Sequence, residues 1–170
     1  MISNNLIGIR IVDDAVQRKL QLMAAHATNT APAMAGISMV MLGEVENNFR
    51  AEGRPTKWKA LTASTLATRA ARGTSGKILQ AKGHLARSIT PFSSNNVGGV
   101  GTNVPYAPAM NNGSKPHVIK AKNKKALYFG GRFAKKVNHP GTAPRPFMVL
   151  TDRGQSDCLK VMAAHIASGG

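Results

Sequence analysis

The chain has 170 residues and 42% of them are apolar, which suits a single domain over residues 1–170 with a core of its own. It has no apolar run near the roughly 20 residues that cross a bilayer, and its first residues lack the regions of a signal peptide. Lys and Arg total 23 against seven acidic residues, and the single cysteine, Cys158, excludes an internal disulfide framework. We therefore expect a basic protein that is made in a reducing cytosol and has no membrane partner.

Five of the seven acidic residues lie in the first third of the sequence, and the other two lie near its end. Between Gly53 and Thr151 there is none, although this block holds 17 of the 23 basic residues. Such a charge favours a polyanion or an acidic protein surface as a neighbour. The alternative is a basic surface without a specific partner.

The first third of the chain predicts helices. A strand predicted over residues 6–12 precedes Asp14, which resembles the start of a capping box, and helical spacing of apolar residues follows. Pro32 suits the first turn of a second, central helix that ends at Gly53. The apolar stripe of this helix contains Met34, Ile37, Met41, Val45 and Phe49. The residues expected mostly on its outer face are Glu44, Glu46, Asn47 and Asn48.

The rest of the chain predicts a third helix, a block of strands and a last helix. Thr62 is the expected N-cap of a helix that stops at Gly73, and Asp152 is the expected cap of the last helix. Residues 117–129 predict two strands around Asn123. We expect the lysine-rich segment 111–125 to be a mobile loop or hairpin. This order predicts the α+β class, with helices against a mainly antiparallel sheet.

No motif for catalysis, metal binding or cofactor binding is present. The sequence GTSGK at residues 73–77 lacks the spacing of a phosphate-binding loop. The five histidines lack metal-ligand spacing, and we expect His26 and His165 to face solvent or to cap helix ends. Cys158 has no evident histidine partner. The sequence therefore predicts a protein that is not an enzyme.

Aromatic and basic residues alternate in the segment KKALYFGGRFAKK, residues 124–136. This texture is also found on surfaces that stack nucleic-acid bases. We interpret it instead as a strand pair whose aromatic residues, Tyr128, Phe129 and Phe133, pack into the core. The lysines would then face water and remain available for phosphate contacts.

Several short motifs occur in an order that resembles the virion morphogenesis proteins of tailed phages, which overlap with tail-completion and head–tail joining components. The motifs are Trp58 with Leu61, Thr65, Leu66 and Arg69; GHLARSI at residues 83–89; Val100-Gly101-Thr102 with Tyr106-Ala107; Asn112-Gly113; and HPG at residues 139–141 with PRPF at residues 144–147. The chain departs from the usual pattern at Lys82 and at Met110-Asn111, where other residues are commoner. The motifs cover about half of the chain.

The resemblance implies an α+β protomer that forms a ring, commonly hexameric, between the connector and the tail tube. In that setting the proline-rich segment gains a role, because prolines restrict the chain before it orders and Arg145 offers several donors in a rigid fork. The expected contacts between copies or with partners are His139, Pro140, Gly141, Pro144, Arg145, Pro146, Phe147 and Trp58. The alternative for this segment is a simple turn that enters the last strand.

The resemblance also suggests a role for the lysines. Genomic DNA passes the channel of such a ring, and lysines on a loop facing the channel would meet phosphates without reading sequence. The candidates are Lys120, Lys122, Lys124 and Lys125. The competing use of the same charge is docking onto an acidic face of the connector or the tail tube.

Together these features predict a structural and assembly protein of a tailed phage, located at the virion neck or tail end and assembled in the host cytoplasm. It would form a homo-oligomeric ring that joins tail to head, as a tail terminator, a tail-completion protein or a neck connector. Its partners would be a connector or head-completion protein, the tail tube protein and, without sequence specificity, DNA. The alternative is a small basic nucleic-acid-binding module of the cytosol.

Overall fold

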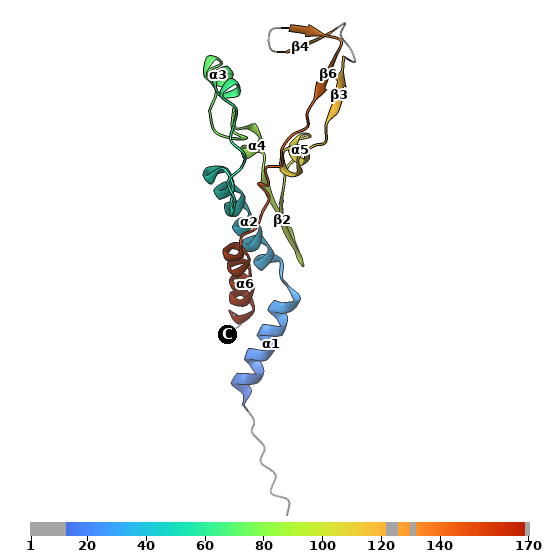
Figure 1. The fold of residues 1–170 in the computed structure, drawn as a ribbon. Coiled ribbons are helices and arrows are strands. Elements are labelled where there is room, and N and C mark those ends of the chain that lie inside the picture. The colour runs from blue at the N-terminus through green and yellow to red at the C-terminus, as the bar shows by residue number, and fades with distance from the viewer. Residues whose placement is uncertain (1–12, 122–125, 130–131, 169–170) are drawn as a thin grey trace, which may run out of the picture.

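The computed structural model describes residues 13–121, 126–129 and 132–168 (Figure 1). The helices are α1 (Asp14–Thr28), α2 (Ala31–Ala51), α3 (Ala63–Ala71), α4 (His84–Arg87), α5 (Ala107–Asn112) and α6 (Asp152–Ala167). The strands are β1 (Thr90–Ser94), β2 (Val97–Gly101), β3 (His117–Lys120), β4 (Leu127–Phe129), β5 (Arg132–Ala134) and β6 (Lys136–His139). The predicted α+β class is confirmed, whereas the strand predicted over residues 6–12 lies outside the described residues. No helix in the described ranges has the length and apolarity to cross a membrane.

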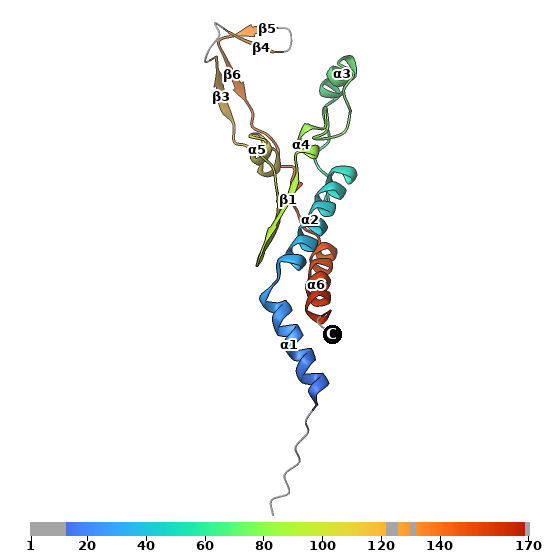
Figure 2. The same ribbon diagram turned by 180° about the vertical axis from the view of Figure 1, so that it is seen from behind.

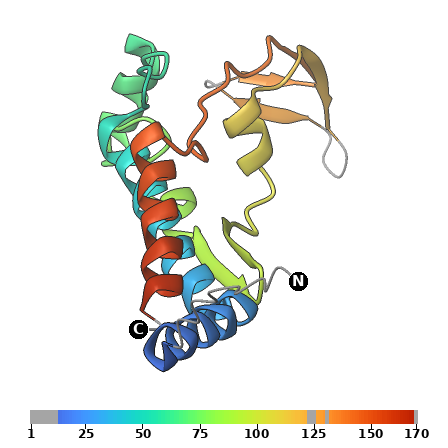
Figure 3. The same ribbon diagram turned by 90° about the horizontal axis from the view of Figure 1, so that it is seen from below.

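The molecule is elongated, with a central body and projections at both ends. In the body α2 packs along α6, and the β1–β2 hairpin lies against α2 (Figures 1 and 2). α1 extends from one end and touches α6 near the C-terminus of that helix. At the other end α3 and a long arm, built from β3–β6 and β4–β5, diverge from each other (Figure 3).

Strand pairing differs from the prediction in two respects. The described strands form three separate two-stranded antiparallel sheets, β1–β2, β3–β6 and β4–β5, rather than one sheet. β3 does not pair with the next strand around Asn123; it pairs with β6, with His117 opposite His139, and the β4–β5 hairpin is inserted between them. The sequence contains a signal for this hairpin, because the two residues between β4 and β5 are both glycines, as in tight two-residue turns.

Side-chain caps set the N-terminal ends of α1, α3 and α6. Thr62 caps α3 as predicted, by accepting a hydrogen bond from the Thr65 amide at 3.3 Å, and Gly73 follows the helix with φ of 62°. The caps of α1 and α6 each lie one residue before the predicted one. Asp13 accepts from the Ala15 amide at 3.0 Å, and Thr151 accepts from the amide of Gly154 at 3.1 Å. Asp14 and Asp152 are therefore in the first helical turn, where a negative charge is also favourable.

The core lies where the body meets the α3 and arm projections. Phe147 is 0% exposed, and its ring lies 5.2 Å from that of Phe49 on α2, which in turn meets Trp58 edge-on at 5.8 Å. The other buried members of this cluster are Val45, Ile78, Leu85, Ile89 and Ala107. One hydrophobic cluster therefore joins α2, α4, α5 and the PRPF motif.

The prediction that Glu44 and Asn48 face outwards is wrong. Glu44 is 8% exposed and Asn48 is 0% exposed. The side-chain amide of Asn48 donates to the carbonyl oxygens of Phe147 and Val149, both at 2.9 Å, and its oxygen accepts from Arg54 Nε at 3.0 Å. The chain from Phe147 to Val149 has no strand partner in the described structure, so its carbonyl groups need donors from elsewhere, and Asn48 on α2 supplies them to Phe147 and Val149.

Replacing Asn48 with alanine is expected to destabilise the fold strongly. Asn48→Ala leaves the buried carbonyl group of Phe147 and the partly buried one of Val149 without donors, and each such loss costs about 1–3 kcal/mol. We expect the free energy of unfolding, measured by urea denaturation, to fall by about 2–4 kcal/mol. Asn47→Ala on the same helix is the matched control and should change it by less than about 0.5 kcal/mol. Equal effects of the two variants would contradict this role of Asn48.

Candidate functional site

Two of the predicted contact residues, Trp58 and Phe147, are buried inside the chain. Trp58 Nε1 donates to the carbonyl oxygen of Pro146 at 3.0 Å. The backbone amides of Phe147 and Met148 both donate to Asn111 Oδ1, at 3.0 and 3.1 Å. These contacts hold the PRPF motif between the segment that carries Trp58 and α5. The structure therefore gives both aromatic side chains a role in the core of the protomer rather than on its surface.

Arg145 binds backbone carbonyl groups of its own chain. Its amide donates to the carbonyl oxygen of Met110 at 2.9 Å, and its Nη2 donates to that of Lys59 at 3.3 Å. Its Nε is buried and has no partner among the described residues. The acceptor that the guanidinium of Arg145 reaches in the described structure, the Lys59 carbonyl group, lies within the protomer. Pro144 and Pro146, on either side of it, are exposed.

The HPG motif closes the base of the arm. Thr142 and Ser114 exchange two backbone hydrogen bonds of 3.0 Å each, which pairs the segment after β6 with the segment before β3. Gly141 has φ of 89°, and a Cβ atom there would collide with the carbonyl oxygen of Ser114. The imidazole of His139 stacks on that of His117 with ring centroids 5.0 Å apart. Glycine is therefore required at this close approach of two backbone segments.

A buried carboxylate ties the start of α6 to α2. Glu44 accepts hydrogen bonds from the amide of Thr151 at 3.2 Å and from its hydroxyl group, and it forms an ion pair with Arg54 at 3.3 Å. Burial by itself raises the pKa of Glu44, but the hydrogen bonds from Thr151 and Arg54 and the charge of Arg54 together hold this pKa below its ordinary value. The ionised form of Glu44 is thus the one that the fold stabilises.

The arm carries exposed aromatic and basic side chains. Tyr128 and Phe133 are 67% and 76% exposed, and their rings lie 4.9 Å apart. The prediction that these two residues pack into the core is wrong, because β4–β5 is a separate two-stranded sheet far from the core cluster (Figure 1). Lys120 is exposed on β3 opposite Lys136 of β6. Lys122, Lys124 and Lys125 lie outside the described residues.

His26 and His165 each cap the helix that carries the other. Capping of helix ends is one of the two roles predicted for them. His26 Nδ1 donates to the carbonyl oxygen of His165 at 2.7 Å, and His165 Nε2 donates to that of Asn29 at 2.8 Å. The two rings stack with their centroids 5.0 Å apart.

Over the described ranges no group of three His, Cys, Asp or Glu residues is placed to hold a metal ion. Burial, aided by the charges of Asp157 and Glu44, raises the pKa of the Cys158 thiol.

A model of the phage virion morphogenesis family matches residues 11–167, nearly the whole chain. The chain belongs to the phage virion morphogenesis family. No curated protein and no solved structure matches it. The resemblance seen in the motifs is therefore confirmed, and the role that follows is structural, in the assembly of a phage virion.

In this family member the HPG and PRPF motifs serve mainly to join the arm to the body. Asn48 and Asn111, which supply that join with hydrogen bonds, were not singled out from the sequence as site residues. A signal for Asn48 was present, because it lies three residues after Val45 and seven after Met41 and so falls on the apolar stripe of α2. For Asn111 the pattern offered no comparable signal.

The left-handed conformation at Gly141 predicts a sharp sensitivity to substitution. Gly141→Ala should lower the free energy of unfolding by about 2 kcal/mol, because an alanine is strained at this φ and its Cβ collides with Ser114. Gly43→Ala is the control: a Cβ there meets nothing within 4 Å in the middle of α2, so it should be neutral or stabilise by about 0.5–1 kcal/mol. Thermal and urea denaturation measure both. A Gly141→Ala variant as stable as the parent would contradict the close approach.

The lowered pKa of Glu44 predicts a pH dependence of stability. A carboxylate with a depressed folded-state pKa contributes stability above its unfolded pKa of about 4.3, and this contribution is lost as the pH falls through the folded pKa. Glu44→Gln should therefore be less stable than the parent at neutral pH, and the difference should shrink below about pH 4. Urea denaturation between neutral and acid pH measures it. Thr151→Ser keeps the hydroxyl donor and should retain the parent's pH dependence, whereas a difference that does not change with pH would refute the assignment.

Proposed function

We propose that this protein assembles with copies of itself into a ring at the head–tail junction of a tailed phage, where it joins the tail to the head and lets DNA pass. In this role the protein is a tail terminator, a tail-completion protein or a neck connector. The observation that carries the proposal is the arm with its exposed aromatic pair, Tyr128 and Phe133.

The arm lacks support from its own chain in the described structure. An isolated two-stranded hairpin is marginal in water, and it gains stability when a further surface covers it. The β1–β2 hairpin has that cover from α2, whereas β4–β5 stands off the body (Figure 2). Two adjacent aromatic side chains at such a place favour contact with another protein molecule. A second copy of the chain is the proposed neighbour.

The opposite end supports the same proposal. α1 has no buried residue, and its apolar side chains Val16, Leu20 and Leu22 are 51%, 59% and 49% exposed. Projections at both ends of an elongated protomer suit contacts between different patches on neighbouring copies. Such heterologous contacts generate a closed ring when the rotation between copies closes. A hexamer is the proposed copy number, after the family resemblance.

Partners and positions within this ring are also proposals. The exposed prolines at the base of the arm, Pro140, Pro144 and Pro146, are the proposed contacts with a neighbour. Lys120 and its opposite residue, Lys136, are exposed and suit phosphates of DNA in the channel or an acidic face of the connector or tail tube. The neck or tail end of the virion is the proposed location.

A second candidate is a basic nucleic-acid-binding module. The specific observation in its favour is again the exposed pair Tyr128 and Phe133, which lies on an arm with lysines and could stack on bases. This function predicts a stable monomer whose affinity for DNA falls steeply with salt. It does not predict a place in the particle.

Cryo-EM of the neck of phage particles that carry this gene tests the ring directly. Rings of density that fit this protomer are expected, with the arm between neighbouring copies. In particles made with Tyr128→Ser and Phe133→Ser together, infectious titre and tail attachment should fall by about tenfold or more, because an aromatic anchor is worth more than about 1 kcal/mol at an interface. Leu159→Ser on α6, 71% exposed, is the control and should have the parent's titre.

Two results would refute the proposal. One is a neck without density for this protomer, together with a monomeric chain that binds DNA. The other is normal tail attachment by particles that carry both serine substitutions in the arm.

A further inference from the structure

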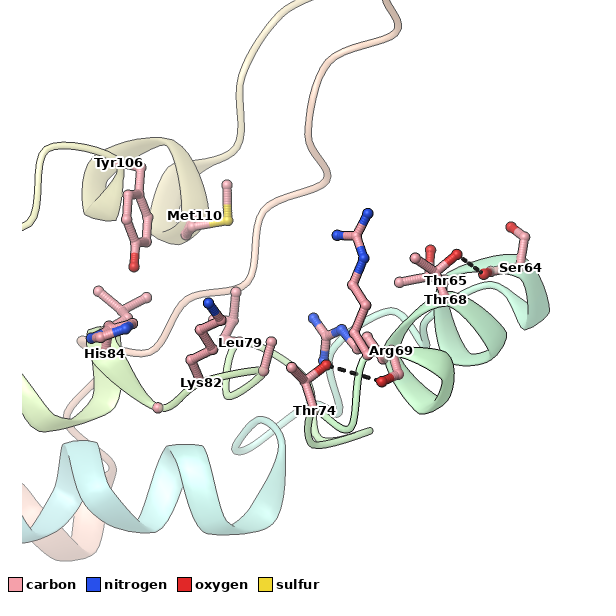
Figure 4. Close-up of a pocket in the computed structure, with 14 residues that line it drawn as sticks. Ser64, Thr65, Thr68, Arg69, Thr74, Leu79, Lys82, His84, Tyr106 and Met110 are labelled. Atoms are coloured by element: carbon pink, nitrogen blue, oxygen red, sulfur yellow. Dashed lines mark hydrogen bonds between the residues drawn. The ribbon is translucent and has the colours of Figure 1, made fainter. Parts of the chain in front are cut away.

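A cavity of about 610 Å³ lies beside α3, between this helix, the loop that follows it and α5 (Figure 4). Its basic lining residues are Arg69, Arg72, Lys82 and His84. No acidic residue lines it. None of its Arg or Lys side chains forms an ion pair in the part of the chain that the structure describes. The cavity thus gathers cations without any counter-charge.

Backbone carbonyl groups, rather than acidic side chains, hold Arg69 in place. Arg69 Nη1 donates to the carbonyl oxygens of Ser75 and Lys77, at 3.1 and 2.7 Å, which binds the loop to α3 and fixes the guanidinium. In Figure 4, Lys82 lies between His84 and Arg69, and the Tyr106 hydroxyl points from α5 toward His84. Like charges that are held close together repel each other, and an anion among them relieves this repulsion.

The remaining lining combines hydroxyl groups with apolar side chains. Hydroxyl groups of α3, among them those of Ser64 and Thr65, lie on the helix side of the cavity. Leu79, Leu85 and Met110 contribute apolar surface, and Leu85 is buried while Leu79 and Met110 pack against the core. An occupant that matches this lining carries negative charges next to an apolar side chain.

We propose that this cavity binds an acidic peptide segment of a partner protein, with carboxylates on Arg69, Arg72 and Lys82 and an apolar side chain against Leu79 and Met110. Bidentate pairing of guanidinium with carboxylate suits the two arginines. Duplex DNA is a poorer match, because its phosphates lie on a convex surface and offer nothing to an apolar wall in a recess. The site stands apart from the proposed ring contacts on the arm and does not depend on ring formation.

A binding experiment on the full chain tests the site. The probe is a fluorescein-labelled hexapeptide in which glutamate and leucine alternate, compared by fluorescence anisotropy with a counterpart that has glutamine for glutamate, at about 0.15 M salt to screen surface charge. We expect the acidic peptide to bind about tenfold more tightly than the glutamine peptide. A third peptide, with serine for leucine, should bind about threefold more weakly than the first, because it loses the apolar contact.

Charge reversal with a matched control locates the binding. Arg72→Glu with Lys82→Glu should weaken the acidic peptide by about tenfold or more. Arg18→Glu with Lys19→Glu makes the same change in net charge on exposed residues of α1 and should weaken it by less than about threefold. Far-UV circular dichroism and thermal unfolding check that both variants fold. Lys82→Gln, a single change at an exposed side chain, is the milder variant, expected to weaken binding by about threefold.

Three outcomes would overturn the inference. The first is equal affinity for the glutamate and glutamine peptides. The second is an equal loss in the two charge-reversed variants, which would assign binding to the overall charge of the chain. The third is tighter binding of a labelled hexathymidylate, sensitive to Arg72 and Lys82, which would make the cavity a nucleic-acid site. If the chain forms rings in the phage neck but fails these peptide tests, the cavity site is refuted and the proposed function is not.

Discussion

The buried amide of Asn48 is the contact on which the rest of the structure depends. It supplies donors to two carbonyl groups of a segment that lies 99 and 101 residues further along the chain. Through it the PRPF motif is held against α2, Phe147 enters the core, and the chain is directed to the start of α6. Glu44, one helical turn earlier on α2, accepts from Thr151 at the N-cap of α6. One face of α2 therefore positions both the return from the arm and the last helix.

The same join explains why so rigid a segment is placed there. The body of the molecule covers little of the apolar surface of the arm, so few contacts along the arm hold it in place. The contacts at its base therefore determine its direction. Gly141 allows two backbone segments to approach closely, and the Ser114–Thr142 bridge pairs them. Prolines on either side of Arg145 reduce the entropy that the connecting chain loses on folding. The HPG and PRPF motifs of this family member are thus a structural joint for a projecting arm.

Acidic and basic residues are distributed unevenly along the long axis of the molecule. The described acidic residues lie on or next to α1, α2 and α6. The sequence from Gly53 to Thr151 contains no acidic residue, and it forms α3 and the arm, the two projections at the end of the molecule opposite α1 (Figure 1). The basic end includes the arm lysines and the cavity beside α3. An elongated assembly protein with one strongly basic end presents different chemistry to neighbours at its two ends. This asymmetry suits the proposed position of the protein between the head and the tail.

The sequence by itself determined the α+β class, α2 and its stop at Gly53, the caps Thr62 and Gly73, and the family, because these depend on local spacing and on short motifs. Only the tertiary structure decided that Asn48 and Glu44 are buried, since the groups that they bind come from about 100 residues away in the chain. It also decided that β3 pairs with β6 and that Tyr128 and Phe133 are exposed. Alternation shows that a strand has two faces, but whether either face is covered depends on which elements pack there, and β4–β5 stands away from the helices of the described chain (Figure 1).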